Sequence, residues 1–213
     1  MSSSPSVLKS SGLLELAVKY SSWAPANWVH TQCAVGDWVT LRSTSWQTSN
    51  ISSSYSTLFR FGGDFYYPLD DLKETHSLLL IGGGVGINPL HSIFQHSAEL
   101  VTAAARPAPS QVSLLYSAAT AEELIFRQQI EERCRLTPGF QAEFFVTREM
   151  GEDGEVKCRR ITKADIERTV RGRQRTERLI CYLCGPPDMV DQLRVWLLQL
   201  NVSEENIRYE LWW

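Results

Sequence analysis

The chain has 213 residues, of which 43% are hydrophobic and 21% charged, and its formal net charge is −3. This composition is that of an ordinary globular protein, and the charge gives no global bias toward nucleic acid or an anionic membrane. The longest apolar run, LLLIGGGVGI, has about half the length of a membrane span and is rich in glycine. Five cysteines at irregular spacings do not form a disulfide framework.

The first 70 residues are expected to be rich in β-structure. The stretches LLELAVKY at 13–20 and DWVTLR at 37–42 predict strands, and APANWVHTQC between them predicts a short helical turn. Residues 43–60 contain ten Ser or Thr among eighteen and show no clean period, which predicts an irregular insertion. Because no targeting segment is visible, we expect an intracellular protein, cytoplasmic unless a longer form carries a mitochondrial transit peptide.

After residue 70, apolar runs of four to eight residues alternate with helical patterns. This alternation is typical of a parallel sheet covered on both faces, and right-handed crossovers make it a doubly wound α/β domain. We expect five strands, near 77–82, 111–117, 141–147, 178–185 and 207–212. The expected helices lie near 88–104, 120–135, 163–171 and 187–200. Thr120 followed by Glu123 predicts a capping box, and Thr162 followed by Asp165 predicts an acidic first turn.

The first of these strands runs into a glycine-rich turn, Gly82-Gly83-Gly84-Val85-Gly86, followed by Ile87-Asn88-Pro89. Glycine adopts positive φ without strain and lets a ligand approach the backbone closely. Pro89 suits the first turn of a helix, and Asn88 is the expected N-cap. The N–H groups and the positive end of such a helix suit a pyrophosphate. The alternative is a tight turn with no ligand, and the pattern matches neither G-x-G-x-x-G nor a Walker loop.

Two further stretches carry chemistry: Cys184-Gly185-Pro186-Pro187-Asp188-Met189 after the fourth strand, and Glu210-Leu211-Trp212-Trp213 at the end. Side chains three apart on a strand point to opposite faces, so Cys181 and Cys184 can share neither a disulfide nor a metal there. We therefore predict that Cys181 lies in the core, that Cys184 lines a ligand cleft, and that the chain has no metal site. The two tryptophans offer a flat surface on which a planar ring can stack; the alternative is that they plug the core.

Taken together, GGGVGINP, CGPPDM and the acidic–aromatic end resemble the ferredoxin–NADP reductase-like flavoenzymes. The resemblance implies that the NAD(P) pyrophosphate binds the turn formed by Gly82, Gly83, Gly84, Val85, Gly86, Ile87, Asn88 and Pro89. It implies that Cys184 lies beside the nicotinamide ring, next to Gly185, Pro186, Pro187 and Met189. It also implies that Glu210 and Trp212 lie near the flavin. Cys184 and Glu210 are therefore the candidate catalytic residues.

In this family a flavin-binding β-barrel precedes the nucleotide domain. We therefore expect a partial, antiparallel FAD-binding barrel over 1–70 and an NAD(P)-binding domain over 71–213. In the family, a flavin motif with an arginine and a tyrosine is followed by a Ser-Ser-Pro segment, which Ser2–Pro5 resembles, so that motif is expected just before it. A second flavin motif falls on Trp23–Ala26, where its glycine and serine are absent. Because the flavin phosphate then loses a charge-assisted arginine contact, these departures argue against stable FAD binding by this chain, although the family implies FAD.

Tyr116, Ser117 and the loop after them are expected to face the adenosine ribose. Alanines and glutamates occupy this loop, where a 2′-phosphate requires an arginine, so NADH is favoured over NADPH unless Arg127 contributes. The leading hypothesis is an oxidoreductase in which NAD(P)H passes hydride to FAD. The alternatives are a non-catalytic NAD(H)-binding remnant without a functional flavin site and an S-adenosylmethionine-dependent transferase. With no cysteine cluster for an iron–sulfur centre, the electron acceptor is expected to be a separate molecule or protein.

Overall fold

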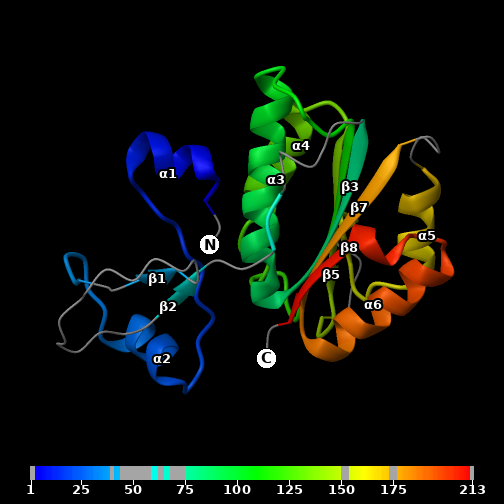
Figure 1. Ribbon diagram of the computed structural model, residues 1–213. Helices are drawn as coiled ribbons and strands as arrows, with labels where there is room; N and C mark the ends of the chain where they lie inside the picture. Colours follow the sequence, from blue (N-terminus) through cyan, green and yellow to red (C-terminus); the bar gives the residue numbers. More distant parts are fainter. Residues whose placement is uncertain are drawn as a thin grey trace.

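The central feature of the computed structural model is a sheet of six parallel strands in the order β6-β5-β4-β3-β7-β8 (Figure 1). The structure describes residues 3–38, 41–43, 59–61, 65–67, 75–149, 154–172 and 177–211. The strands are β3 His76–Gly83, β4 Gln111–Ala118, β5 Phe140–Val146, β6 Val156–Lys157, β7 Arg178–Gly185 and β8 Ile207–Leu211. Five of them confirm the expected strands. The expected total of five is wrong, because β6 has only two residues and such a strand is too short to produce a sequence period.

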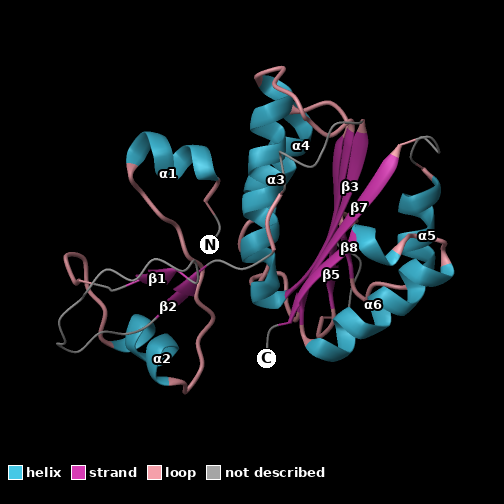
Figure 2. Cartoon of the chain, viewed as in Figure 1, coloured by secondary structure: helices cyan, strands magenta, loops and turns pink. Residues whose placement is uncertain are grey.

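Helices cover both faces of this sheet, as expected for a doubly wound domain (Figure 2). On one face, α3 (Ile87–Thr102) and α4 (Arg127–Leu136) pack over a core that includes Leu78 and Leu80 of β3. On the other face, α5 (Lys163–Arg171) and α6 (Pro187–Gln199) pack over Leu79 and Ile81. Successive β3 side chains therefore enter two different apolar cores, which explains the unbroken apolar run in the sequence.

The first turns of two helices differ in how well the sequence predicted them. At α5, the side chain of Thr162 and that of Asp165 form a complete capping box. At α4, the helix begins at Arg127 rather than near 120, and residues 120–126 form turns. The predicted capping box at Thr120 is wrong because the Glu123 carboxylate instead accepts a hydrogen bond from the N–H of Ala119 and pairs with Lys19.

The front part of the chain contains α1 (Pro5–Ser11), α2 (Ala24–Thr31), β1 (Leu41–Ser43) and β2 (Phe59–Phe61). The helical turn expected near residue 24 is confirmed as α2. The strand expected over 13–20 is wrong: this segment is irregular, and its backbone hydrogen-bonds a side chain instead of a neighbouring strand. Of the strand expected over 37–42, β1 confirms only the end, and residues 39–40 lie outside the described part of the chain.

The expected antiparallel barrel is not confirmed by the described residues. The strand pairing seen in this front part is β1 with β2, and it is parallel. Most of the expected irregular insertion, residues 44–58, lies outside the described ranges.

A short segment at 65–67 lies against the sheet. The Tyr67 hydroxyl is 2.5 Å from His76 Nε2 at the start of β3, and the Tyr182 hydroxyl of β7 donates to the carbonyl oxygen of Tyr66 at 2.9 Å. These contacts fix where the front part joins the sheet. No helix in the described part of the chain is long and apolar enough to cross a membrane.

Candidate functional site

Two turns meet at the carboxyl edge of the sheet, where β3 lies beside β7. The chain moves outward from β3 to β4, β5 and β6, and then returns to β7 on the other side of β3. Such a reversal of strand order is the place where doubly wound sheets bind ligands. Strand register places Gly82 level with Tyr116 on β4 and with Cys184 on β7, and places Cys184 level with Glu210 on β8. The fold thus brings predicted site residues from four strands into one row.

The glycine-rich turn of β3 packs directly on the turn that follows β7. A Cβ atom at Gly83 would lie 2.6 Å from Met189 Sδ and 3.0 Å from Pro186 Cδ. A Cβ atom at Gly86 would overlap the carbonyl group of Cys184, and one at Gly185 would lie 3.2 Å from the nitrogen of Gly83. Gly86 is therefore required by the close approach of the two backbones, and Gly83 and Gly185 are favoured by it, whether or not a ligand is present.

Gly84 differs from the other glycines of the turn. Its φ is +55°, and no atom of the described residues lies within 4 Å of the position that a Cβ would occupy. It begins a short 3-10 helix, η2 (Gly84–Gly86), that leads into α3. The first N–H groups of a helix have no partners within the helix, and the helix dipole makes this end positive. The turn therefore places an open, positively polarised backbone at the point where strand order reverses, as a phosphate group requires.

Asn88 does not have the predicted role. The N-cap position of α3 is Gly86, and no side chain caps the helix there. Asn88 is 5% exposed, and its Nδ2 donates to the carbonyl oxygen of Val85 at 2.9 Å. Pro89, four residues after Val85, has no N–H to donate to that oxygen, which accepts from the N–H of Ile87 and from the Asn88 amide. Pro89 lies in the first turn of the helix, as predicted.

The Asn88 amide also binds the front part of the chain. Nδ2 donates to the carbonyl oxygen of Ala17 at 3.0 Å, and Oδ1 accepts from the N–H of Ala17 at 3.1 Å. One side chain therefore joins the glycine-rich turn to the segment for which the sequence predicted a strand. The sequence does not predict this role of Asn88 or the participation of Ala17, because no local pattern links positions so far apart.

The two cysteines of the C-x-x-C lie on opposite faces of the sheet, as predicted. Cys181 belongs to the core under α5 and α6, and Cys184 belongs to the core under α3. Both side chains are fully buried. Cys184 is thus placed directly beneath the carboxyl edge, level with Glu210, whose side chain is half-buried. Its assignment to the nicotinamide side of the site stays a prediction.

The other residues predicted around Cys184 lie in the turn and the first residues of α6. Pro186 precedes α6 and Pro187 begins it, and both are exposed, whereas Met189 is half-buried beside Gly83. Trp212, which was predicted to lie near a flavin, falls outside the described residues. Within the described ranges, no group of three or more His, Cys, Asp or Glu side chains could hold a metal ion.

At the end of β4, the two predicted ribose contacts differ in exposure. Tyr116 is fully buried, and its hydroxyl donates to the carbonyl oxygen of Glu123 at 2.8 Å. Burial raises the pKa of this hydroxyl, and the nearby Glu123 carboxylate raises it further. A contact of Tyr116 with a nucleotide would therefore come from its backbone. Ser117, one residue nearer the edge, is half-buried.

Carboxylates dominate the loop after β4. Glu123 accepts from the N–H of Ala119 and forms an ion pair with Lys19 at 3.0 Å, and the hydrogen bond from Lys19 is the main cause that lowers the pKa of Glu123. Glu149 accepts from the N–H of Ala121 at 2.8 Å. Lys19 was not foreseen as a neighbour of this loop, because it comes from the front part of the chain.

Arg127, the residue that could have favoured NADPH, is already paired. Its guanidinium lies 2.6 Å from the carboxylate of Glu131 and 2.7 Å from that of Glu155. These two contacts direct its charge toward α4 and toward the segment before β6.

Comparison with known proteins agrees with this geometry. The model of the oxidoreductase NAD-binding domain matches residues 80–194. A relative from Danio rerio, Oxidoreductase NAD-binding domain-containing protein 1, is 36% identical over 99% of this chain and 73% of its own length. The chain spans 63% to 73% of the length of the curated relatives of that name.

Solved structures share the fold. The Amycolatopsis cytochrome P450 reductase GcoB matches 70% of this chain and 41% of its own, with a TM-score of 0.56 and 26% identity. A ferredoxin NADP+ reductase from Neisseria gonorrhoeae, solved with bound FAD and NADP, matches 65% of this chain and 57% of its own, with a TM-score of 0.51 and 22% identity. The doubly wound fold expected from the sequence is confirmed.

Proposed function

The chain belongs to the oxidoreductase NAD-binding domain family, and from this membership we propose that it acts as a flavin-linked NAD(P)H oxidoreductase. The observation that carries the proposal is the backbone at Gly84, which has positive φ and faces open space where the strand order reverses. A turn that served only to connect β3 with α3 would need the glycines that pack on the turn after β7. The positive φ of Gly84 favours glycine in such a turn as well, so the support for a ligand comes from the open space that the described residues leave beside this backbone.

The residues of the chain have distinct parts in this proposal. Gly84, Val85 and Gly86 hold the pyrophosphate at the positive end of α3. The turn at Cys184 and Gly185, held against the glycine-rich turn, forms the floor on which the nicotinamide is oriented. Glu210, level with Cys184 on β8, lies on the side from which a flavin would approach. The bound NAD(P)H supplies the hydride, and the protein supplies binding and orientation.

We propose NADH as the preferred nucleotide. The loop after β4 carries the carboxylate of Glu123, and Glu149, which follows β5, accepts a hydrogen bond from Ala121 of that loop. Both carboxylates disfavour a 2′-phosphate. Arg127, at the start of α4, is engaged by two other carboxylates, and Lys19, the cation that lies at this loop, is paired with Glu123. A ribose hydroxyl, by contrast, can donate to a carboxylate at this position.

A second candidate is an NAD(H)-binding protein that holds no flavin. It is favoured by the front part of the chain, whose described residues do not supply the barrel on which the family binds FAD. For this reason we derive no catalytic step through FAD. The electron acceptor in the leading proposal is a separate molecule or protein.

Calorimetric titration of the purified chain with NADH, NADPH and S-adenosylmethionine tests the nucleotide site. We expect NADH to bind, NADPH to bind at least tenfold more weakly, and S-adenosylmethionine to show no heat of binding. Glu123→Gln should narrow the gap between NADH and NADPH, because it removes a negative charge from the ribose loop. If S-adenosylmethionine binds and NADH does not, the oxidoreductase proposal is wrong.

The flavin half of the proposal has its own test. Purified protein that retains FAD is yellow, and anaerobic NADH should then bleach the flavin absorbance. Colourless protein that takes up no added FAD but still binds NADH supports the second candidate.

A further inference from the structure

The segment at 13–20 contacts both loops of the candidate nucleotide site. Ala17 hydrogen-bonds the side chain of Asn88, beside the turn assigned to the pyrophosphate. Two residues later, Lys19 pairs at 3.0 Å with Glu123, in the loop assigned to the ribose. The segment therefore runs from one end of the site to the other, although it belongs to the front part of the chain.

The amide of Asn88 uses all its hydrogen-bonding groups in this arrangement. One Nδ2 hydrogen is donated to Val85, the other to the carbonyl oxygen of Ala17, and Oδ1 accepts from the Ala17 N–H. The reversed orientation of the amide would place its oxygen against two carbonyl oxygens and its NH₂ against an N–H. The hydrogen bonds therefore fix the orientation of the Asn88 amide. The amide binds both the N–H and the carbonyl oxygen of Ala17, as the backbone of a neighbouring strand would.

The two contacts of the segment differ in strength. Asn88 is buried, so breaking its bonds would leave the N–H and the carbonyl oxygen of Ala17 without the partners that they have here. Lys19 and Glu123 are an exposed pair, with 56% and 35% of their side chains accessible, and such pairs contribute little. The connection between the segment and the site thus depends mainly on Asn88.

We propose that Asn88 is a positioning residue that couples the segment 13–20 to nucleotide binding at the glycine-rich turn. The inference rests on the proposed function, because it takes the turn as the pyrophosphate site. A nucleotide that holds Val85 and its neighbours in one conformation also holds the amide of Asn88, and through it Ala17. By thermodynamic reciprocity, the docked segment stabilises the turn in its binding conformation.

Other contacts keep the front part near the sheet when Asn88 is changed. The Ser4 hydroxyl donates to Glu99 at 2.6 Å, and the Ser92 hydroxyl donates to the carbonyl oxygen of Ser3 at 2.8 Å. Ser92 and Glu99 both lie on α3, well beyond its first turn. A variant at Asn88 should therefore lose the coupling without losing the fold.

Amide hydrogen exchange with and without saturating NADH tests the coupling on the whole chain. In the wild type we expect NADH to slow exchange in the glycine-rich turn, and to slow it severalfold at 13–20, which the nucleotide need not touch. In Asn88→Ala the slowing at 13–20 should disappear, and the affinity for NADH should fall about tenfold.

Two further variants separate coupling from shape. Asn88→Asp keeps the shape of the side chain and suits the first turn of a helix, but it loses both donors; we expect it to lose the NADH effect at 13–20 as Asn88→Ala does. Asn206→Ala is the matched control, because Asn206 binds Arg178 at the far edge of the sheet. It should leave both the affinity and the effect at 13–20 unchanged.

The outcomes distinguish the two levels of the argument. If wild-type protein binds no NADH, the proposed function is wrong and the coupling falls with it. If NADH binds and protects the turn but leaves 13–20 unchanged, or if the effect at 13–20 survives in both Asn88 variants, the coupling is overturned while the proposed function stands.

Discussion

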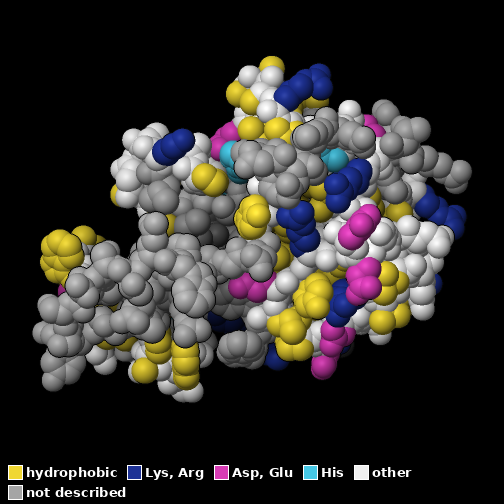
Figure 3. Space-filling view, viewed as in Figure 1, with side chains coloured by type: hydrophobic (Ala, Val, Ile, Leu, Met, Phe, Trp, Pro, Cys, Tyr) yellow, Lys and Arg dark blue, Asp and Glu magenta, His cyan; other side chains and the backbone are white. Residues whose placement is uncertain are grey.

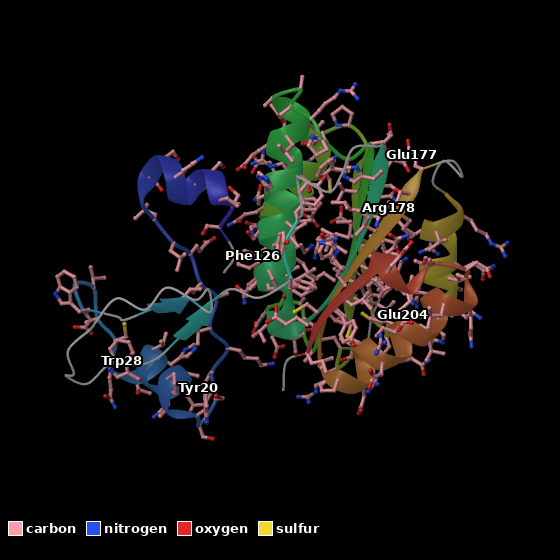
Figure 4. All side chains as sticks on the ribbon, viewed as in Figure 1. Tyr20, Trp28, Phe126, Glu177, Arg178 and Glu204 are labelled. Carbon is pink, nitrogen blue, oxygen red and sulfur yellow. The ribbon has the colours of Figure 1, made fainter. Side chains whose placement is uncertain are left out.

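The sheet domain and the front part of the chain are stabilised in different ways. Residues from His76 to Leu211 build two apolar cores, one on each face of the sheet. Among residues 12–38, by contrast, no side chain is buried, and α2 has no buried residue. Large apolar side chains stand at the surface here, including Tyr20 and Trp23, and Figure 4 shows Tyr20 and Trp28 on this side of the molecule, apart from the sheet.

Tyr67 at the end of the front part is buried in the core of the sheet domain, and Ala17 packs against that core. Before residue 65, the described contacts that hold the front part are mainly polar. Figure 3 shows hydrophobic side chains at the surface of both parts, so surface composition alone does not distinguish them. The distinction lies in the contacts with α3: Ser4 with Glu99, Ser3 with Ser92, and Ala17 with Asn88. A region held by a few hydrogen bonds opens at a lower free energy than a packed core. The front part should therefore open before the sheet domain unfolds.

The largest expected effect contrasts one aromatic residue from each region. Phe94 is fully buried in α3 and makes an edge contact with Phe140 at 5.2 Å between ring centroids. Phe94→Ala should lower the free energy of unfolding by about 3–5 kcal/mol. Trp23→Ala, at an exposed aromatic position, should change it by less than about 0.5 kcal/mol. Urea denaturation measures both, and a comparable loss in the two variants would show that the front part has a core of its own.

The turn at Gly86 tests whether the candidate site belongs to the rigid region. Gly86→Ala would place a Cβ in the space occupied by the backbone of Cys184. Because neither backbone can move away easily, the variant should lose about 3 kcal/mol of the free energy of unfolding. Gly154→Ala is the matched control, because no atom in the described part of the chain lies within 4 Å of its Cβ position. Thermal unfolding compares the two variants. If Gly86→Ala were as stable as the control, the two turns would not be in the close contact described above.

The sequence predicts the sheet domain well and the front part of the chain poorly. The run from Leu78 to Ile81 is buried on both faces, so its apolar sequence indicated a central parallel strand directly. The segment at 13–20 is also rich in apolar residues, but its backbone is bound by the Asn88 side chain, and a pattern cannot show which partner takes a hydrogen bond. In the site, the glycines and the C-G-P turn were identifiable because tight turns demand particular residues. The roles of Asn88 and Lys19 were not, since both depend on contacts between distant segments.

One ion pair inside the sheet domain and one that joins it to the front part differ in burial. Asp165 is 1% exposed and bound by both terminal nitrogens of Arg159, whereas the pair that joins the regions, Lys19 with Glu123, is exposed. Asp165→Asn should cost about 2 kcal/mol at neutral pH, because it weakens a buried charged hydrogen-bond network. Lys19→Ala should cost less than about 0.5 kcal/mol. Chemical denaturation at pH 7 measures the difference between the two.

The pH dependence of the Asp165 variant follows from its pKa. Hydrogen bonds from Arg159 and then from Thr162 and Arg168 outweigh burial and hold the pKa of this carboxyl far below its usual value. Its contribution is therefore fully present above the unfolded value of about 3.9 and is lost as the pH falls through the folded pKa. The difference between wild type and Asp165→Asn should stay constant above about pH 5 and narrow below about pH 4. A gap that is unchanged at low pH would contradict this.

The contact of Ser4 with Glu99 tests most directly whether the front part opens separately from the sheet domain. Breaking it should cause the smallest change in global stability. Partial burial raises the pKa of Glu99, but hydrogen bonds from Ser4, Ser6 and His96 outweigh it, and the pKa is lowered overall. The docking of α1 is therefore stabilised above the unfolded pKa of about 4.3 and weakens as the pH falls through the folded value. The protection of the α1 amides, measured relative to the intrinsic exchange rate at each pH, should therefore fall below about pH 4 while the β3 amides stay protected.

Variants at this contact should reproduce the effect of acid at neutral pH. Glu99→Gln and Ser4→Ala each weaken the charge-assisted bond, so exchange in α1 should accelerate severalfold while the global free energy of unfolding changes by less than about 1 kcal/mol. Ser10→Ala is the matched control, because the Ser10 hydroxyl bonds only within α1, to Val7. If α1 and β3 amides exchanged together in wild type and variants alike, the two regions would open as one unit and the polar contacts would not be what separates them.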